Sequence, residues 1–210
     1  MLALFLSAFA TLFVVIDPPG CAPIYAGLTA SATPRQAFTM AARACLIATG
    51  ILVVFALFGE DLLGALHIEL DSFRIAGGIM LFLIALDMVF EKRTERREER
   101  AEKVRTAQSQ GQPHVEDVSV FPMAMPMLAG PGSIASVMLL TARAKGYEET
   151  LVILGALGAV MLLSFVALVA ARPLIRMLGS QVEAVITRLL GVLLAALAAQ
   201  FVIDGIRAQF

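Results

Sequence analysis

The sequence predicts an all-α polytopic membrane protein with six transmembrane helices, arranged as two inverted three-helix repeats. The first support is hydrophobicity: 59% of the 210 residues are hydrophobic and the mean hydropathy is +0.86, well above the values of soluble domains. The second support is a short Pro/Gly-rich break at a corresponding place in each half. These breaks make the first and fourth helices discontinuous.

Six apolar segments are each long enough to cross a bilayer, which takes about 20 helical residues. The segments are 2–31, 36–58, 70–90, 118–142, 150–171 and 184–206. They fill nearly the whole chain, which leaves no room for a soluble domain. We therefore divide the chain into a first three-helix repeat (1–91), a charged loop (92–117) and a second three-helix repeat (118–210).

Loop charge predicts the orientation of the chain in the membrane. Cytoplasmic loops carry the excess of Lys and Arg, and the loop at 92–117 is the most basic in the sequence. We expect this loop inside the cell and both termini on the periplasmic or extracellular side. No Lys or Arg precedes the first apolar segment, so we expect an uncleaved helix there and not a signal peptide.

The two breaks lie at residues 17–23 and 125–133, and Pro19-Gly20 precedes Pro131-Gly132 by 112 residues. The third segments of the two halves align with an offset of 114 residues, which pairs Arg74 with Arg188. Three spans per half is an odd number, so the second half enters the membrane from the opposite face. Paired broken helices in inverted repeats are typical of transporters that bind their substrate near the bilayer midplane.

The breaks supply the candidate substrate-binding residues. These are Asp17, Pro19, Gly20, Cys21, Gly130, Pro131, Gly132 and Ser133. The second half-helices are expected to begin near residues 21–23 and near Ser133, where the Ser hydroxyl would act as a cap. Half-helix N-termini suit an anion, and the carbonyls that end the first halves suit an ammonium group. A small neutral amino acid carries both groups.

Asp17 is the sharpest single candidate, because an acid within a span is energetically expensive and usually functional. It could hold the substrate amine or take up a transported proton. Alternatively, it could accept hydrogen bonds from backbone N–H groups and stabilise the break. Its counterpart at the offset of the breaks is Ala129. The sequence leaves these interpretations open.

Five further polar residues within or near the spans are predicted to support the site. Arg43 is expected to extend to the cytoplasmic interface. Arg74 and Arg188 are expected to bond carbonyls freed by the breaks. Asp87 would pair with a basic group or mark the interface, and Gln200 would make an interhelical hydrogen bond.

The sequence contains no metal-binding constellation and no nucleotide-binding motif, so we expect no metal, no cofactor and no enzymatic activity. A net charge of −1 excludes a basic surface for nucleic acid. The expected partners are the lipid bilayer, a small-molecule substrate and, as an open alternative, a proton or other coupling ion. The oligomeric state is left open.

Segments 16–24, 73–79 and 126–134 together resemble the MarC (UPF0056-type) family of integral membrane proteins, and the resemblance covers essentially the whole chain. It implies a six-helix inner-membrane transporter with broken first and fourth helices. For the branch of the family that includes SnatA, it implies transport of glycine, alanine and similar amino acids. Here Pro19 stands where members often carry another residue, and Cys21 stands where Asn is frequent, which removes an amide from the expected site.

The leading hypothesis is a secondary transporter that moves a small neutral amino acid by alternating access. One alternative is a transmembrane thiol oxidoreductase that uses Cys21, with Cys45 as the second sulfur that thiol exchange requires. Another is a structural membrane protein without transport activity, which would leave two costly breaks without a purpose.

Overall fold

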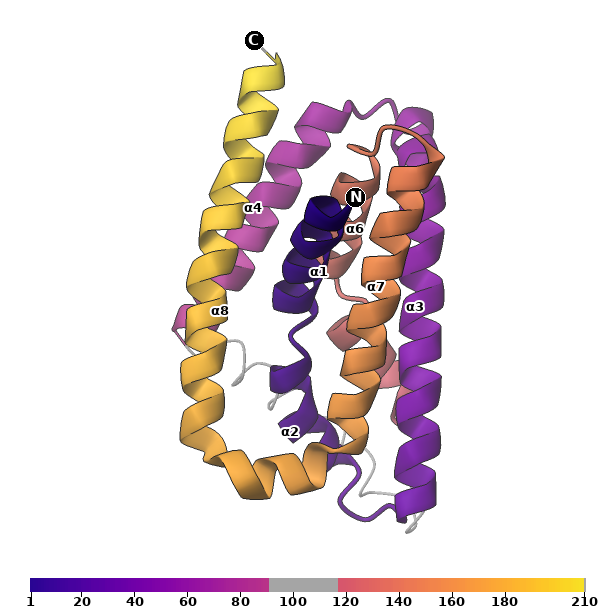
Figure 1. The fold of residues 1–210 in the computed structure, drawn as a ribbon, viewed down its shortest axis with the longest axis vertical. Coiled ribbons are helices and arrows are strands. Elements are labelled where there is room, and N and C mark those ends of the chain that lie inside the picture. Colours follow the sequence, from indigo (N-terminus) through magenta and orange to yellow (C-terminus); the bar gives the residue numbers. More distant parts are fainter. Residues whose placement is uncertain (91–116, 210) are drawn as a thin grey trace.

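The computed structural model describes residues 1–90 and 117–209, and every regular element in these ranges is helical. Five of the helices are long and apolar enough to cross a membrane, or six spans when one sharply bent pair is counted as a single span. The predicted all-α polytopic architecture is therefore confirmed (Figure 1). The predicted charged loop, 92–117, lies outside the described residues apart from Asp117.

The first half consists of α1 (Leu2–Ile16), α2 (Pro18–Leu28), α3 (Pro34–Ala65) and α4 (Leu70–Val89). Asp17 alone separates α1 from α2. A reciprocal capping box between Thr33 and Gln36 begins α3, with Pro34 in its first turn. Each apolar segment predicted for this half is helical.

The second half consists of η1 (Ser119–Leu128), α6 (Pro131–Thr141), α7 (Tyr147–Val169) and α8 (Ala171–Gln209). η1 is an irregular helical segment whose backbone is extended at Phe121 and Met125. Each of these residues precedes a proline, which disfavours helical backbone at that position. η1 and α6 are bent by 54° relative to each other, so the predicted break in the fourth span is confirmed.

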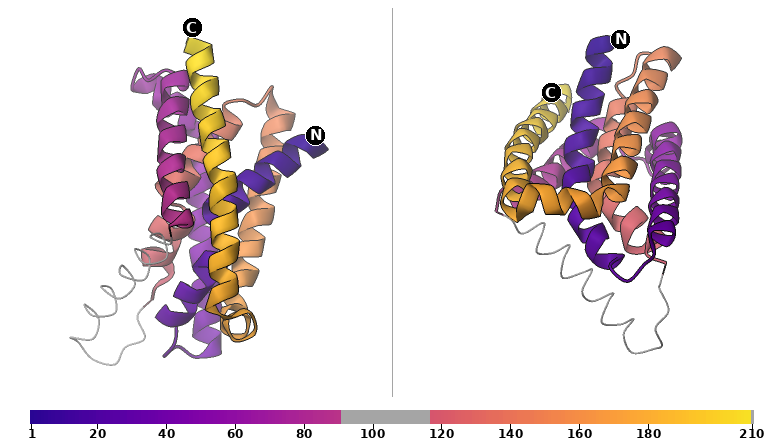
Figure 2. Two further views of the ribbon diagram at one scale, coloured as in Figure 1. Left: turned by 90° about the vertical axis from the view of Figure 1, so that its left-hand side faces the viewer. Right: turned by 60° about the horizontal axis from the view of Figure 1, so that its bottom comes forward.

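The connection between the last two predicted segments is helical, because α8 begins directly after α7. The first part of α8 crosses one end of the bundle, and the helix then turns to run beside α4 (Figure 1). Both chain termini lie toward the other end (Figure 2).

The two halves pack on each other reciprocally. α1 packs against α7, and η1 packs in the same way against α3. α2 contacts α7 and α8, while α6 contacts the equivalent helices α3 and α4. The last helices of the two halves, α4 and α8, form the most extensive helix pair. Inverted repeats produce this exchange of contacts.

Glycine contacts between α4 and α8 fix the register of the repeat. A Cβ atom on Gly78 would lie 2.9 Å from the Ala198 carbonyl oxygen, and a Cβ atom on Gly191 would lie 3.1 Å from the Ala85 carbonyl oxygen. An offset of 113 residues relates these two contacts. The same offset relates three buried pairs of one core cluster, namely Leu81 and Leu194, Ala85 and Ala198, and Met88 and Phe201.

The predicted offset of 114 in this helix is therefore wrong by one residue. An offset of 114 aligns the two identical arginines, but a shift of one residue along a helix rotates the side-chain direction by about 100°. In the observed register, Arg74 corresponds to Thr187, a buried residue, and Arg188 is exposed. Arg74 and Arg188 are thus not equivalent.

We expect Gly78→Ala and Gly191→Ala each to lower stability by roughly 1–3 kcal/mol, because the added methyl group meets the packed surface of the opposite helix. Thermal unfolding of the detergent-purified protein measures this. Gly155→Ala and Gly158→Ala are matched controls in α7, because their Cβ atoms would meet nothing within 4 Å. Equal stability of all four variants would contradict the close packing of α4 on α8.

Candidate functional site

Asp17 forms the first break by ending one helix and beginning the next. It is 1% exposed and left-handed, with φ 57° and ψ 65°. Its N–H donates to the Phe13 carbonyl, its own carbonyl accepts from the Cys21 N–H at 3.1 Å, and its Oδ1 accepts from the Gly20 N–H at 3.1 Å. A side-chain oxygen in this position stabilises a helix N-terminus, so the interpretation that Asp17 stabilises the break is confirmed.

α2 begins at Pro18, earlier than the start predicted near residues 21–23. Pro18 and Pro19 occupy its first turn, where a missing N–H costs nothing, and Pro23 lies inside the helix. A Cβ atom on Gly20 would lie 2.2 Å from Asp17 Oδ2. The Asp17 cap therefore requires glycine at position 20.

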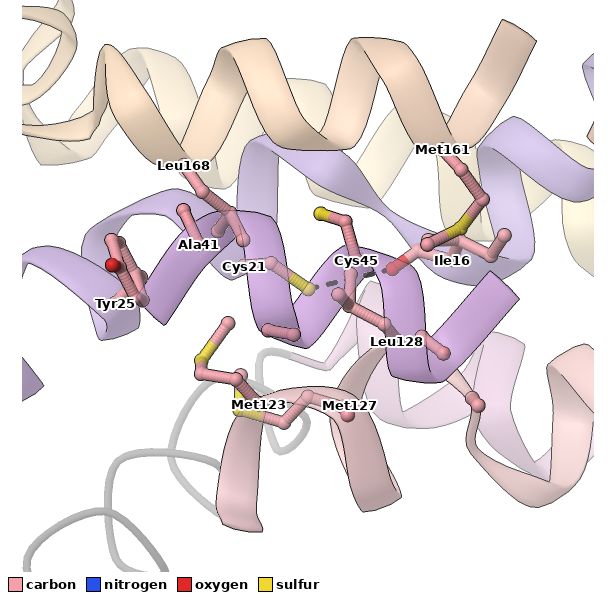
Figure 3. Packing of buried hydrophobic residues seen from close by; sticks show 14 of the residues in the cluster. Ile16, Cys21, Tyr25, Ala41, Cys45, Met123, Met127, Leu128, Met161 and Leu168 are labelled. Carbon is pink, nitrogen blue, oxygen red and sulfur yellow. Dashed lines mark hydrogen bonds between the residues drawn. The ribbon is translucent and has the colours of Figure 1, made fainter. Parts of the chain in front are cut away.

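The thiol of Cys21 donates to the Ile16 carbonyl oxygen at 3.5 Å, across the first break (Figure 3). It thereby serves one of the carbonyls freed at the end of α1. Cys21 lies in a buried core cluster that also contains Cys45 from α3 and Leu128 from the end of η1. Both cysteines are free thiols in the structure.

Gly130 begins α6 at the second break, with extended backbone and no side-chain cap. Ser133 is buried in the first turn of α6, so the prediction that its hydroxyl caps the half-helix is wrong. The Ile134 N–H donates to the Gly130 carbonyl, as the Cys21 N–H donates to Asp17. The structural counterpart of Asp17 is thus Gly130 and not Ala129, at the same offset of 113 residues.

The structure brings the two breaks to one level inside the bundle. A Cβ atom on Gly132 would lie 3.4 Å from Val15 Cγ1, beside the first break, and 2.6 Å from Ile84 Cδ1 of α4. Residues flanking both breaks, Ile16 and Cys21 as well as Leu128 and Ala129, share one buried cluster. Pro19 is half-buried and Pro131 is exposed, whereas the other predicted substrate-binding residues are buried.

The sequence model that describes the MarC family integral membrane proteins matches residues 2–210. The chain belongs to the MarC family. A UPF0056 membrane protein of Archaeoglobus fulgidus is 34% identical over 208 residues, which are 98% of this chain and 93% of the relative.

Two further relatives match over a similar length. A UPF0056 membrane protein of Methanocaldococcus jannaschii is 32% identical over 203 residues, 97% of this chain and 96% of its own. The UPF0056 inner membrane protein YhgN of Escherichia coli K12 is 32% identical over 204 residues, 96% of this chain and 95% of its own. No solved structure matches the chain. Membership of the MarC family and the apolar helices establish a multi-pass membrane protein.

Two of the predicted supporting residues of this MarC family protein, Arg43 and Arg74, form ion pairs with residues outside the breaks. Arg43 is exposed and pairs with Asp117 at 2.8 Å, close to the start of η1. Arg74 pairs with Asp71 at 2.8 Å within α4, so it bonds no carbonyl of a break. Arg188 is exposed and Asp87 is half-buried.

Gln200 joins a polar cluster at the end of the bundle where the chain terminates. Its Nε2 donates to Asp204 Oδ1 at 2.6 Å within α8, so the predicted interhelical bond is wrong. Asp204 also pairs with Arg143 at 2.8 Å, and the Arg143 guanidinium lies 5.0 Å from the Phe201 ring centroid. This cluster ties the end of α6 to α8. The sequence does not reveal it, because 61 residues separate Arg143 from Asp204.

Asp117 was also not predicted as a partner of Arg43. Hydrogen bonding from Ser119, whose N–H donates to Asp117 Oδ1 at 3.0 Å, and the positive charge of Arg43 hold the pKa of the Asp117 carboxyl below its ordinary value of 3.8. Asp117 is therefore ionised at neutral pH, and its ion pair with Arg43 is intact there. The pair ties the entry of η1 to α3.

We expect Asp17→Ala to destabilise this MarC family protein by roughly 2 kcal/mol, through loss of the cap and the cost of a left-handed Ala. Asp17→Asn should cost only a few tenths of a kcal/mol, because Asn caps helices nearly as well and tolerates this backbone. Thermal unfolding of both variants in detergent tests the difference. If Asn proves as destabilising as Ala, the cap is not what holds the break.

Proposed function

We propose that this MarC family protein is a secondary transporter that moves a small neutral amino acid across the inner membrane by alternating access. The observation that carries the proposal is the meeting of two interrupted helices at one level inside the bundle. Lipid does not tolerate irregular backbone unless protein or an internal water-filled cavity satisfies its polar groups. Two such interruptions at one place are costly, and an internal binding site gives them a purpose.

The chemistry of the helix ends supports a zwitterionic substrate. The N-terminus of α6 carries partial positive charge and no side-chain cap. The carbonyl ends of α1 and η1 approach the same level with partial negative charge. The neighbouring side chains, among them Val15, Leu81 and Ile84, are apolar and close to Gly132. These surroundings favour an amino acid with a short side chain.

The reciprocal packing of the halves supports alternating access, since rocking one half against the other can open either end. Ion pairs lie at the two ends of the bundle. Arg43–Asp117 ties α3 to the entry of η1, and Arg143–Asp204 ties the end of α6 to α8. We propose that they close the cytoplasmic and the outer end respectively, with both chain termini outside the cell. The inner membrane location is supported by the name of the relative YhgN.

Asp17 is the proposed proton-binding group. Its carboxylate is buried and caps α2, so a proton taken up there removes the charge that favours the helix N-terminus. Protonation would thereby act directly on the break. Asn at this position retains a cap but cannot carry the proton.

We expect purified protein in liposomes to exchange labelled glycine, alanine or serine for unlabelled substrate. Asp17→Asn should retain this exchange and lose uptake driven by a pH gradient. If the wild-type protein moves none of the three amino acids under any gradient, the substrate class is wrong. If Asp17→Asn keeps uptake driven by the pH gradient, another group carries the proton.

The second candidate function is thiol oxidoreduction, which the shared core position of Cys21 and Cys45 favours. We expect Cys21→Ser to retain transport, because the Ser hydroxyl can also donate to the Ile16 carbonyl. Counterflow of labelled glycine into liposomes containing this variant is the measurement. Retained transport removes the thiol function, whereas abolished transport with an unchanged fold means that the Cys21 sulfur itself is required.

A further inference from the structure

The N-termini of α2 and α6 are equivalent in the repeat but are satisfied differently. At α2, the Asp17 carboxylate accepts from the Gly20 N–H. At α6, no side chain caps the helix, although Gly132 and Ser133 are buried. The first N–H groups of a helix have no partner within it. Among the described residues, we find no hydrogen bond to the N–H of Gly132 or Ser133.

The chain cannot supply its own carboxylate at α6. The position that corresponds to Asp17 is Gly130, where a Cβ atom would lie 2.5 Å from the carbonyl oxygen of Pro126. Asp, Asn, Ser and Thr, the usual capping residues, are therefore all excluded by the backbone of η1. The protein thus provides a carboxylate at the N-terminus of α2 but has no space for a capping side chain at the N-terminus of α6.

Ser136 gives an independent indication of a ligand. It is 0% exposed, and within the described part of the chain its hydroxyl has no hydrogen-bond partner. Four other buried or half-buried hydroxyls donate to the carbonyl four residues earlier, namely those of Thr29, Thr49, Thr141 and Ser164. The buried hydroxyls of Ser119 and Thr187 also lack a partner in this part of the chain, but neither lies in α6. An unpaired buried hydroxyl is costly, so a partner outside the protein is favoured.

The helix geometry directs Ser136 toward the first turn of α6. It follows Gly132 by four residues and therefore lies on the same face. Helical side chains also lean toward the N-terminus of their helix and cover the preceding turn. This direction places the Ser136 side chain over the first turn of α6, on the face of Gly132.

We propose that the N–H groups of Gly132 and Ser133 and the hydroxyl of Ser136 bind the carboxylate of the transported amino acid. The substrate carboxylate then accepts hydrogen bonds from the N-terminus of α6, as the Asp17 carboxylate accepts one from the N-terminus of α2. A helix N-terminus is a favourable place for such an anion. This inference rests on the proposed transport function and adds which protein groups hold which end of the substrate.

The test is the KM for glycine counterflow in liposomes that contain wild-type protein, Ser136→Ala or Ser164→Ala. Loss of a hydrogen bond to a charged group should raise the KM of Ser136→Ala by about tenfold or more. Ser164→Ala is the matched control, because it removes a buried hydroxyl that already has a partner in Val160, and its KM should be unchanged. Glycinamide, which lacks the carboxylate, should not compete with glycine in the wild-type protein.

Thermal unfolding without substrate separates binding from a structural role. Ser136→Ala should be at least as stable as the wild-type protein, because the hydroxyl it removes has no partner. An unchanged KM for Ser136→Ala overturns the inference, and so does a loss of stability of this variant without substrate. In either case, glycine transport by the wild-type protein still upholds the proposed function. Competition by glycinamide as strong as by alanine also overturns the inference. A wild-type protein that moves no glycine, alanine or serine overturns both.

Discussion

Inside a bilayer, a backbone N–H or C=O group has no water to bond, and this constraint governs the rest of the structure. Continuous helices satisfy it along most of the chain, but each break frees several groups. At the first break, Asp17 and Cys21 supply partners from their own side chains. The left-handed backbone of Asp17 and the missing side chain of Gly20 follow from that solution.

The protein combines a symmetric scaffold with asymmetric chemistry. The helices of the two halves make equivalent contacts. In the pair formed by α4 and α8, a glycine of each helix packs against the backbone of the other. The breaks do not repeat in this way. The first break contains the buried carboxylate of Asp17. The second contains Gly130, where the backbone leaves no space for a side chain. Specific binding to one orientation of a substrate depends on such a difference, because a fully symmetric site would treat both orientations alike.

The sequence predicts the spans and the breaks well, because hydrophobic length and Pro/Gly punctuation are local signals. It predicts the repeat register less well. Aligning Arg74 with Arg188 matches residue types but not helix faces. The contacts of Gly78 and Gly191 reveal the correct offset between the two halves. The sequence also places the start of α2 too late, because Pro18, Pro19 and Pro23 are all acceptable first-turn residues.

The long-range ion pairs and the unpaired hydroxyl of Ser136 could not be predicted from the sequence. Arg43 and Asp117 are 74 residues apart, and no local pattern joins them. A serine inside a helix usually bonds the preceding turn, so only the structure distinguishes Ser136 from Ser164. Both differences depend on tertiary packing, which a single sequence does not show.

The reciprocal packing of α4 on α8 has a thermodynamic consequence. In the proposed alternating-access cycle, exchanging the conformations of the two halves would recreate the same glycine contacts, so this helix pair would add nearly equal free energy to the two exchanged states. It therefore sets no preference between them. The resting population must be decided by groups that have no equivalent in the other half, such as Asp17 and the Arg143–Asp204 pair. In that proposed cycle, a few polar side chains would determine toward which side of the membrane the empty protein faces.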